Sequence, residues 1–195
     1  FSGIPVVKKW DEDEPKRPRY YAGDDASAYW YSAPDIFVAD AYKRLPAEQR
    51  QRFHPFLSGF NPNDKNADAH IRRMLELDPG LWQGIGEIFT RHDDLTALIH
   101  GSAPRADNEA LARVFHLAAE YDLPVMLHSN ITSKRERNPL YLEEIEAPLR
   151  NHPHVRFIWA HAGTSAEIHR HQEKLDFLLE TVERMLGQYP NLYID

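Results

Sequence analysis

The chain of 195 residues carries 23 Lys and Arg against 30 Asp and Glu, so its formal net charge is −7. This acidic balance argues against nucleic acid or an anionic membrane as a main partner, and the absence of cysteine excludes disulfides and thiolate metal sites. Hydrophobic residues make up 42% of the chain, and its length favours a single domain over residues 1–195. No apolar run reaches about 18 residues, so we expect no transmembrane helix, and we expect a cytoplasmic location.

The first half of the chain predicts three strands and two helices. The strands are short apolar runs at residues 4–7, 53–60 and 81–89, and the helices are periodic stretches at residues 35–45 and 67–77. Between the first strand and the first helix, residues 11–34 are charged and aromatic with little periodicity. A connection of this length predicts a lid or a binding loop inserted into the domain.

The second half continues the alternation of strands and helices. Asp107 is the expected cap of a helix that runs to about Tyr121. Strands are then predicted at residues 125–128, 155–160 and 192–194, separated by a helix at residues 140–150 and another that ends near Leu186. Six strands and five helices in this order predict an α/β fold with a parallel sheet. A doubly wound sheet and a (β/α)₈ TIM barrel both fit, but no glycine-rich nucleotide loop opens a helix, which favours the barrel.

Three side chains that could bind a metal or take part in catalysis lie near the ends of predicted strands. They are Glu87, His128 and His161, separated by 41 and 33 residues, which is about one strand–helix unit each. A parallel barrel directs the C-terminal ends of all its strands to one face, so we expect the three to converge there. Each histidine has the alternative of a buried structural role, whereas a carboxylate on an apolar strand is costly unless it has a partner.

Four segments resemble the amidohydrolase superfamily, in particular its branch of TIM-barrel metal-dependent hydrolases. They are Gly84-Ile-Gly-Glu-Ile88, Leu127-His-Ser-Asn130, Phe157-Ile-Trp-Ala-His-Ala-Gly163 and Tyr189-Pro-Asn-Leu-Tyr-Ile-Asp195. The resemblance implies a (β/α)₈ barrel that binds one or two divalent metals. The family's His-x-His on the first strand and its Asp on the eighth strand have no counterpart here. We therefore expect an incomplete barrel of about six βα units.

The resemblance also assigns roles to individual residues. His128 resembles the metal-ligating histidine of the fifth barrel strand and His161 that of the sixth, while Glu87 resembles the carboxylate that some members use on the fourth. Glu87 and His161 are the implied catalytic groups, since His161 serves either as a ligand or as an acid/base. Zinc is the first expectation for the metal, with manganese, iron or nickel as alternatives.

Two further residues are candidates for contacting the substrate. The guanidinium of Arg91 can bind a carboxylate through two parallel hydrogen bonds, although a solvated loop charge is an equal alternative. Asn130 can polarise a substrate oxygen or simply cap a loop. The pair His169 and His171 imitates a His-x-His motif, but on a helix or loop side chains two residues apart diverge, so we expect no metal there.

These observations predict a metal-dependent hydrolase that attacks an amide, ester or lactone bond of a small organic molecule with activated water. One alternative keeps the site but performs decarboxylation or another lyase reaction. A second alternative is an inactive barrel that acts as a binding module. The expected partner is a small-molecule substrate, without nucleic acid or membrane, and homo-oligomerisation is left open.

Overall fold

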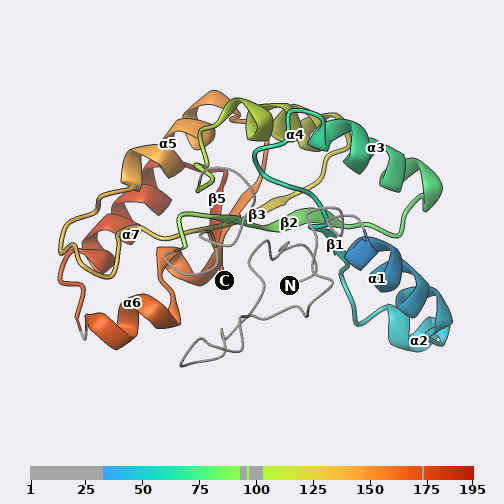
Figure 1. The fold of residues 1–195 in the computed structure, drawn as a ribbon, viewed down its shortest axis with the longest axis horizontal. Helices are drawn as coiled ribbons and strands as arrows, with labels where there is room; N and C mark the ends of the chain where they lie inside the picture. The colour runs from blue at the N-terminus through green and yellow to red at the C-terminus, as the bar shows by residue number, and fades with distance from the viewer. Residues whose placement is uncertain (1–32, 93–95, 97–102, 173) are drawn as a thin grey trace, which may run out of the picture.

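The computed structural model describes residues 33–92, 96, 103–172 and 174–195 (Figure 1). The strand predicted at residues 4–7 and the lid predicted at residues 11–34 lie outside this part of the chain, apart from residues 33 and 34, which begin the first helix.

A parallel sheet of five strands organises the described chain. The strands are β1 (Phe56–Leu57), β2 (Gly84–Thr90), β3 (Val125–Ser129), β4 (Phe157–Trp159) and β5 (Leu192–Ile194), and they lie side by side in chain order. Each connection therefore steps in the same direction, whereas a doubly wound sheet reverses its order. Figure 1 shows the helices along the outer side of the row of strands. This α/β arrangement is consistent with part of a TIM barrel.

The helices match the predicted pattern with local differences. They are α1 (Ala33–Arg44), α2 (Ala47–Arg50), α3 (Ala67–Leu77), α4 (Glu109–Glu120), α5 (Leu142–Asn151), α6 (Ala166–His171) and α7 (Leu178–Gln188). The helix predicted to end near Leu186 is α7, and the loop predicted before it contains the short α6. The strand predicted at residues 53–60 pairs only at Phe56–Leu57. No helix in the described ranges is long and apolar enough to cross a membrane.

The predicted cap of α4 is wrong by one residue. Asn108, rather than Asp107, is the N-cap, and its side-chain oxygen accepts a hydrogen bond from the amide of Leu111 at 2.8 Å. Asp107 instead accepts two hydrogen bonds from Arg105, at 2.9 and 2.8 Å, and these lower the pKa of Asp107. Both residue types cap helices well, so sequence alone does not separate them.

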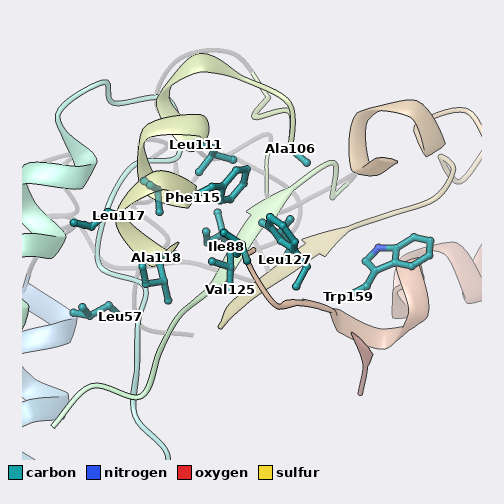
Figure 2. Close-up of a cluster of buried hydrophobic side chains, with 14 of the residues drawn as sticks. Leu57, Ile88, Ala106, Leu111, Phe115, Leu117, Ala118, Val125, Leu127 and Trp159 are labelled. Carbon is teal, nitrogen blue, oxygen red and sulfur yellow. The ribbon is translucent and has the colours of Figure 1, made fainter. Parts of the chain in front are cut away.

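The hydrophobic core lies between the sheet and the helices. Alternate strand residues face the helices, and those of β1, β3 and β4 are at most 1% exposed: Leu57, Val125, Leu127, Phe157 and Trp159. They pack with apolar residues of α3, α4, α5 and α7 in one cluster, part of which Figure 2 shows. We call the opposite side, which carries Met126, Ile158 and Tyr193, the inner face. Met126 and Ile158 are partly buried, and Tyr193 is 50% exposed.

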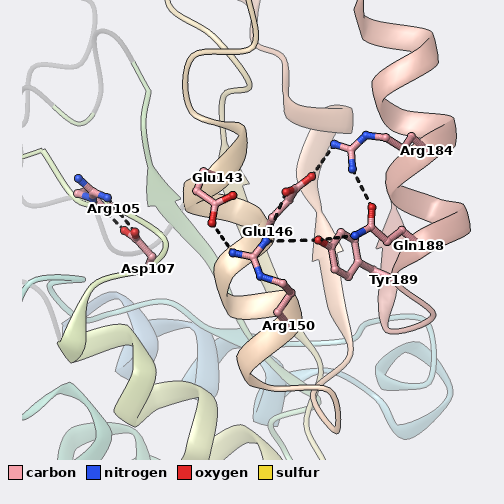
Figure 3. Close-up of polar contacts among 8 residues, drawn as sticks. All are labelled: Arg105, Asp107, Glu143, Glu146, Arg150, Arg184, Gln188 and Tyr189. Atoms are coloured by element: carbon pink, nitrogen blue, oxygen red, sulfur yellow. Dashed lines mark hydrogen bonds and ion pairs between the residues drawn. The ribbon is translucent and has the colours of Figure 1, made fainter.

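An ion-pair network on the outside joins α5 to the end of α7 (Figure 3). Arg150 of α5 contacts Glu143 and Glu146 of its own helix and reaches the hydroxyl of Tyr189. Arg184 of α7 completes the link by donating to Glu146. The two arginines are 42% and 44% exposed, so solvent weakens the contribution of these ion pairs to stability.

A β-bulge interrupts β2 where it passes β3. Ile85 pairs with Val125 and Ile88 pairs with Leu127, so β2 uses one residue more than its partner over the same distance. Ile85 and Ile88 consequently both face the helices, and both are almost fully buried. The bulge therefore turns Glu87 to the inner face, where regular alternation from Ile85 would have pointed it at the helices.

Gly86 makes this bulge sterically accessible. Its φ of +126° lies in a region that side chains disfavour, and a Cβ there would lie 2.3 Å from the carbonyl oxygen of Met126. We expect Gly86→Ala to lower the free energy of unfolding by about 2 kcal/mol or more, as measured by urea denaturation.

Gly187 provides the matched control, because a Cβ added to it in α7 meets nothing within 4 Å. Gly187→Ala should raise the free energy of unfolding by up to about 1 kcal/mol. Equal stability of the two variants would show that the bulge does not need glycine.

A pair of histidines, His116 on α4 and His152 just before β4, should make the fold sensitive to acid. Burial, and secondarily the charge of His116, lower the pKa of His152, whose ring lies 4.9 Å from that of His116. Because the folded state then binds fewer protons than the unfolded state, stability should fall as the pH drops below about 6.5 toward the folded pKa. The midpoint of urea denaturation at pH 7.5 and 5.5 measures this loss. His116→Gln should reduce it, and an unchanged loss would mean that His116 does not contribute.

Candidate metal centre

Glu87, His128 and His161 lie together on the inner face. The carboxylate oxygen Oε1 of Glu87 is 2.6 Å from Nδ1 of His128 and 3.5 Å from Nε2 of His161. One potential ligand atom from each residue lies within 4.8 Å of the others. The structure thus brings together three residues that are 41 and 33 positions apart in the sequence. Their role as metal ligands stays a prediction.

His128 is placed by the register of β3. It follows Met126 by two residues and therefore faces the same side of the sheet. Its ring is almost fully buried and stacks on Phe89, with the ring centroids 5.0 Å apart. Phe89 reaches this side because it lies beyond the bulge, directly opposite His128 in the ladder.

His128 is in direct contact with Glu87. Nδ1 of the ring lies 2.6 Å from Oε1 of the carboxylate, and Nε2 is buried with no hydrogen-bond partner among the described residues. A carboxylate only accepts hydrogen bonds, so Nδ1 donates to it where no cation lies between the two groups. The donor set of two imidazoles and a carboxylate suits a divalent metal.

His161 is held by its backbone in an uncommon conformation. It lies directly after β4 in a short 3₁₀ turn, Ala160–Gly163, with φ of +55° and ψ of +28°. The carbonyl oxygen of His161 accepts hydrogen bonds from the amide and the hydroxyl of Thr164, and its amide donates to the carboxylate of Asp195. These contacts hold the non-glycine residue in the left-handed region, which is uncommon away from functional sites.

Gly163 closes the same turn against the sheet. Its φ is +75°, and a Cβ would lie 2.1 Å from the indole ring of Trp159. The indole in turn donates from Nε1 to the carbonyl oxygen of Ser129, at 2.7 Å. The turn that carries His161 is therefore anchored to the ends of both β3 and β4.

Arg91 lies close to the site, but its guanidinium has a protein partner. It donates two hydrogen bonds to the carboxylate of Glu144 in α5, at 2.7 and 2.6 Å, and it stacks on the ring of Tyr141 at 4.6 Å. The bonds to Glu144 raise the pKa of Arg91. The backbone of Arg91 also bridges two loops, since its amide donates to Pro104 and its carbonyl accepts from Asn130. A role in substrate binding stays a prediction, and it would require Arg91 to leave Glu144.

Asn130 is 1% exposed at the end of β3. The side-chain nitrogen Nδ2 of Asn130 lies 3.4 Å from the hydroxyl of Ser165, while the side-chain oxygen has no partner among the described residues. The predicted contact between Asn130 and a substrate is not tested by this arrangement, in which the side chain is buried.

His92 is a neighbour of the site to which the sequence assigned no role. Its ring is 7% exposed and lies 4.8 Å from that of His128, at an angle of 46°. The only sequence signal was its position shortly after the strand that carries Glu87. His169 and His171, by contrast, are exposed on α6 and do not belong to the cluster of potential ligands.

Glu87 also borders a cavity of about 590 Å³ on the inner face. The other residues that line it come from the beginnings of β1, β2 and β3 or just before them: His54, Phe56, Gln83, Pro124 and Met126. The cavity therefore extends from Glu87 away from the strand ends at which the two histidines stand.

A comparison with models of protein families identifies one family. A family model described as "Amidohydrolase" matches residues 18–195. Among solved structures, the chain is similar to dihydroorotase from Campylobacter jejuni, with 17% sequence identity and a TM-score of 0.43, over 69% of this chain and 33% of that one. The chain thus spans about a third of the length of this structure. No curated protein sequence matches the chain.

The contact between Arg91 and Glu144 leads to a stability prediction. The two side chains are only 22% and 11% exposed, so Arg91→Ala would leave a poorly solvated carboxylate with only the longer contact to Arg105, at 3.6 Å. We expect the free energy of unfolding to fall by about 2 kcal/mol, measured by urea denaturation. Arg72 and Glu120 form the same two-bonded geometry, at 2.7 Å in both bonds, on an exposed surface. Arg72→Ala should change stability little, and an equal loss in both variants would contradict the role of burial.

Proposed function

The chain belongs to the amidohydrolase family, and from this premise we propose that it forms part of a metal-dependent hydrolase that cleaves an amide, ester or lactone bond of a small organic substrate. The complete enzyme would be a (β/α)₈ barrel, of which the described sheet supplies five neighbouring strands. The active site would lie at the C-terminal ends of these strands, where barrels of this type carry their chemistry.

One observation carries the proposal, namely the convergence of three donor groups. Oε1 of Glu87 lies 2.6 Å from Nδ1 of His128 and 3.5 Å from Nε2 of His161. One potential ligand atom from each residue lies within 4.8 Å of the others, so a cation bound between them would replace these direct contacts.

Glu87, His128 and His161 would hold the metal, which when bound lowers the pKa of a water molecule and polarises a carbonyl group. His161 is suited to moving protons, because its side chain is about half exposed and its Nε2 faces Glu87.

Zinc is the metal we propose first. Two imidazoles and one carboxylate form a ligand set that zinc uses in catalytic sites, with a further position left for water. The chain has no cysteine, so softer thiolate chemistry is excluded. Manganese, iron and nickel accept the same donors and are the alternatives for measurement.

Metal content tests the proposal. We expect purified protein to hold one or two equivalents of divalent metal by plasma mass spectrometry, and His128→Ala to lower the occupancy at least tenfold because it removes the buried donor. Glu87→Gln keeps the size of the side chain but removes its charge, and should also reduce occupancy.

His169→Ala is the matched control, since it removes an exposed imidazole of α6 and should leave the metal content unchanged. Absence of metal from the wild-type protein, including its longest natural form, would contradict the hydrolase and favour an inactive binding module. If metal is present, turnover of amides, esters and lactones set against aromatic carboxylic acids separates hydrolysis from decarboxylation.

A further inference from the structure

We propose that Asp195 is a positioning residue for His161, which it holds through the backbone amide while facing the ring from the side opposite Glu87. The proposal rests on the metal site described above and adds a residue to it. Asp195 lies directly after β5 and is not one of the three candidate ligands.

The sheet register places Asp195 beside His161. Trp159 pairs with Ile194 in the parallel ladder between β4 and β5, so the chain leaves both strands at the same level. Asp195, the residue directly after β5, then lies alongside the turn that follows β4. Two residues that are 34 positions apart are thereby brought into contact by strand pairing alone.

One oxygen of Asp195 makes two contacts with His161. Oδ1 accepts the hydrogen bond of the His161 amide, and it lies 3.7 Å from Nδ1 of the ring. The hydrogen bond from the amide helps to hold His161 at its positive φ. The carboxylate also favours a proton on the ring nitrogen that faces it. A proton on Nδ1 leaves the lone pair on Nε2, which points toward Glu87 at 3.5 Å.

The four side chains then form one continuous sequence of contacts from Asp195 through His161 and Glu87 to His128. Metal-ligating histidines generally donate their second nitrogen to a carboxylate or carbonyl, which orients the ring and increases its basicity. Glu87 contacts Nδ1 of His128 and lies on the Nε2 side of His161. Asp195 is the described carboxylate that faces the remaining nitrogen of His161.

The effect should be moderate, because the pair is partly exposed. The side chains of His161 and Asp195 are 49% and 41% exposed, so solvent screens the attraction between them. Loss of such an outer partner typically reduces metal affinity by about 10- to 100-fold, and the exposure places the expected effect at about tenfold.

The test combines two measurements on the wild-type protein, Asp195→Ala and Asp195→Asn. Hydrogen exchange of the His161 amide, followed by NMR in metal-free protein, reports the backbone contact. Zinc affinity, measured by competition with a chromophoric chelator, reports the orientation of the ring. Asp195→Ala should expose the His161 amide to exchange and weaken zinc binding about tenfold. Asp195→Asn keeps an amide acceptor but no charge, so it should retain protection while losing part of the zinc affinity.

Glu48→Ala controls for the change in net charge, since this residue is exposed on α2, and it should change neither measurement. Unchanged exchange of the His161 amide in Asp195→Ala would overturn the proposal, as would wild-type zinc affinity in that variant. Zinc loss as complete as in His128→Ala would make Asp195 a ligand and also overturn it. A wild-type protein without zinc affinity would refute the proposed hydrolase instead, and amide exchange would then decide the positioning role by itself.

Discussion

The bulge in β2 is the constraint on which the candidate metal centre depends. A strand alternates strictly between two faces, and a slip by one residue exchanges them. Because β2 has one residue more than β3 between Ile85 and Ile88, both isoleucines remain in the core while Glu87 faces the other side. The same extra residue aligns Phe89 with His128. Without glycine at position 86, whose Cβ would meet the backbone of β3, this geometry would not be accessible.

The three candidate ligands are held with unequal rigidity. Glu87 and His128 belong to paired strands and are buried or nearly so, whereas His161 lies in a turn and is half exposed. The turn is nevertheless held at several points, by Thr164, by Asp195 and by the packing of Gly163 on Trp159. A rigid pair with a third, more accessible imidazole suits a site in which one residue exchanges protons with the substrate or solvent.

The loops around the strand ends are tied together by the contact between Arg91 and Glu144. It connects the segment after β2 to α5, and the backbone of Arg91 adds hydrogen bonds toward Pro104 and Asn130. A guanidinium in this position had suggested recognition of a substrate carboxylate, yet its two-bonded partner comes from the protein itself. The same chemistry that makes arginine a good anion receptor also makes it an effective structural link between loops.

The amino-acid sequence by itself determined the parallel α/β alternation, the bounds of α3 and β5, and the three chemically capable residues near strand ends. These features follow from local periodicity and from the rule that parallel strands end on one face. Only the tertiary structure decided that Glu87 faces inward, that Asn108 rather than Asp107 caps α4, and which carboxylates meet Arg91 and His161. Arg91 and Glu144 are 53 residues apart, and His161 and Asp195 are 34 apart. Strand register and helix placement, which the local pattern does not encode, bring such distant groups together.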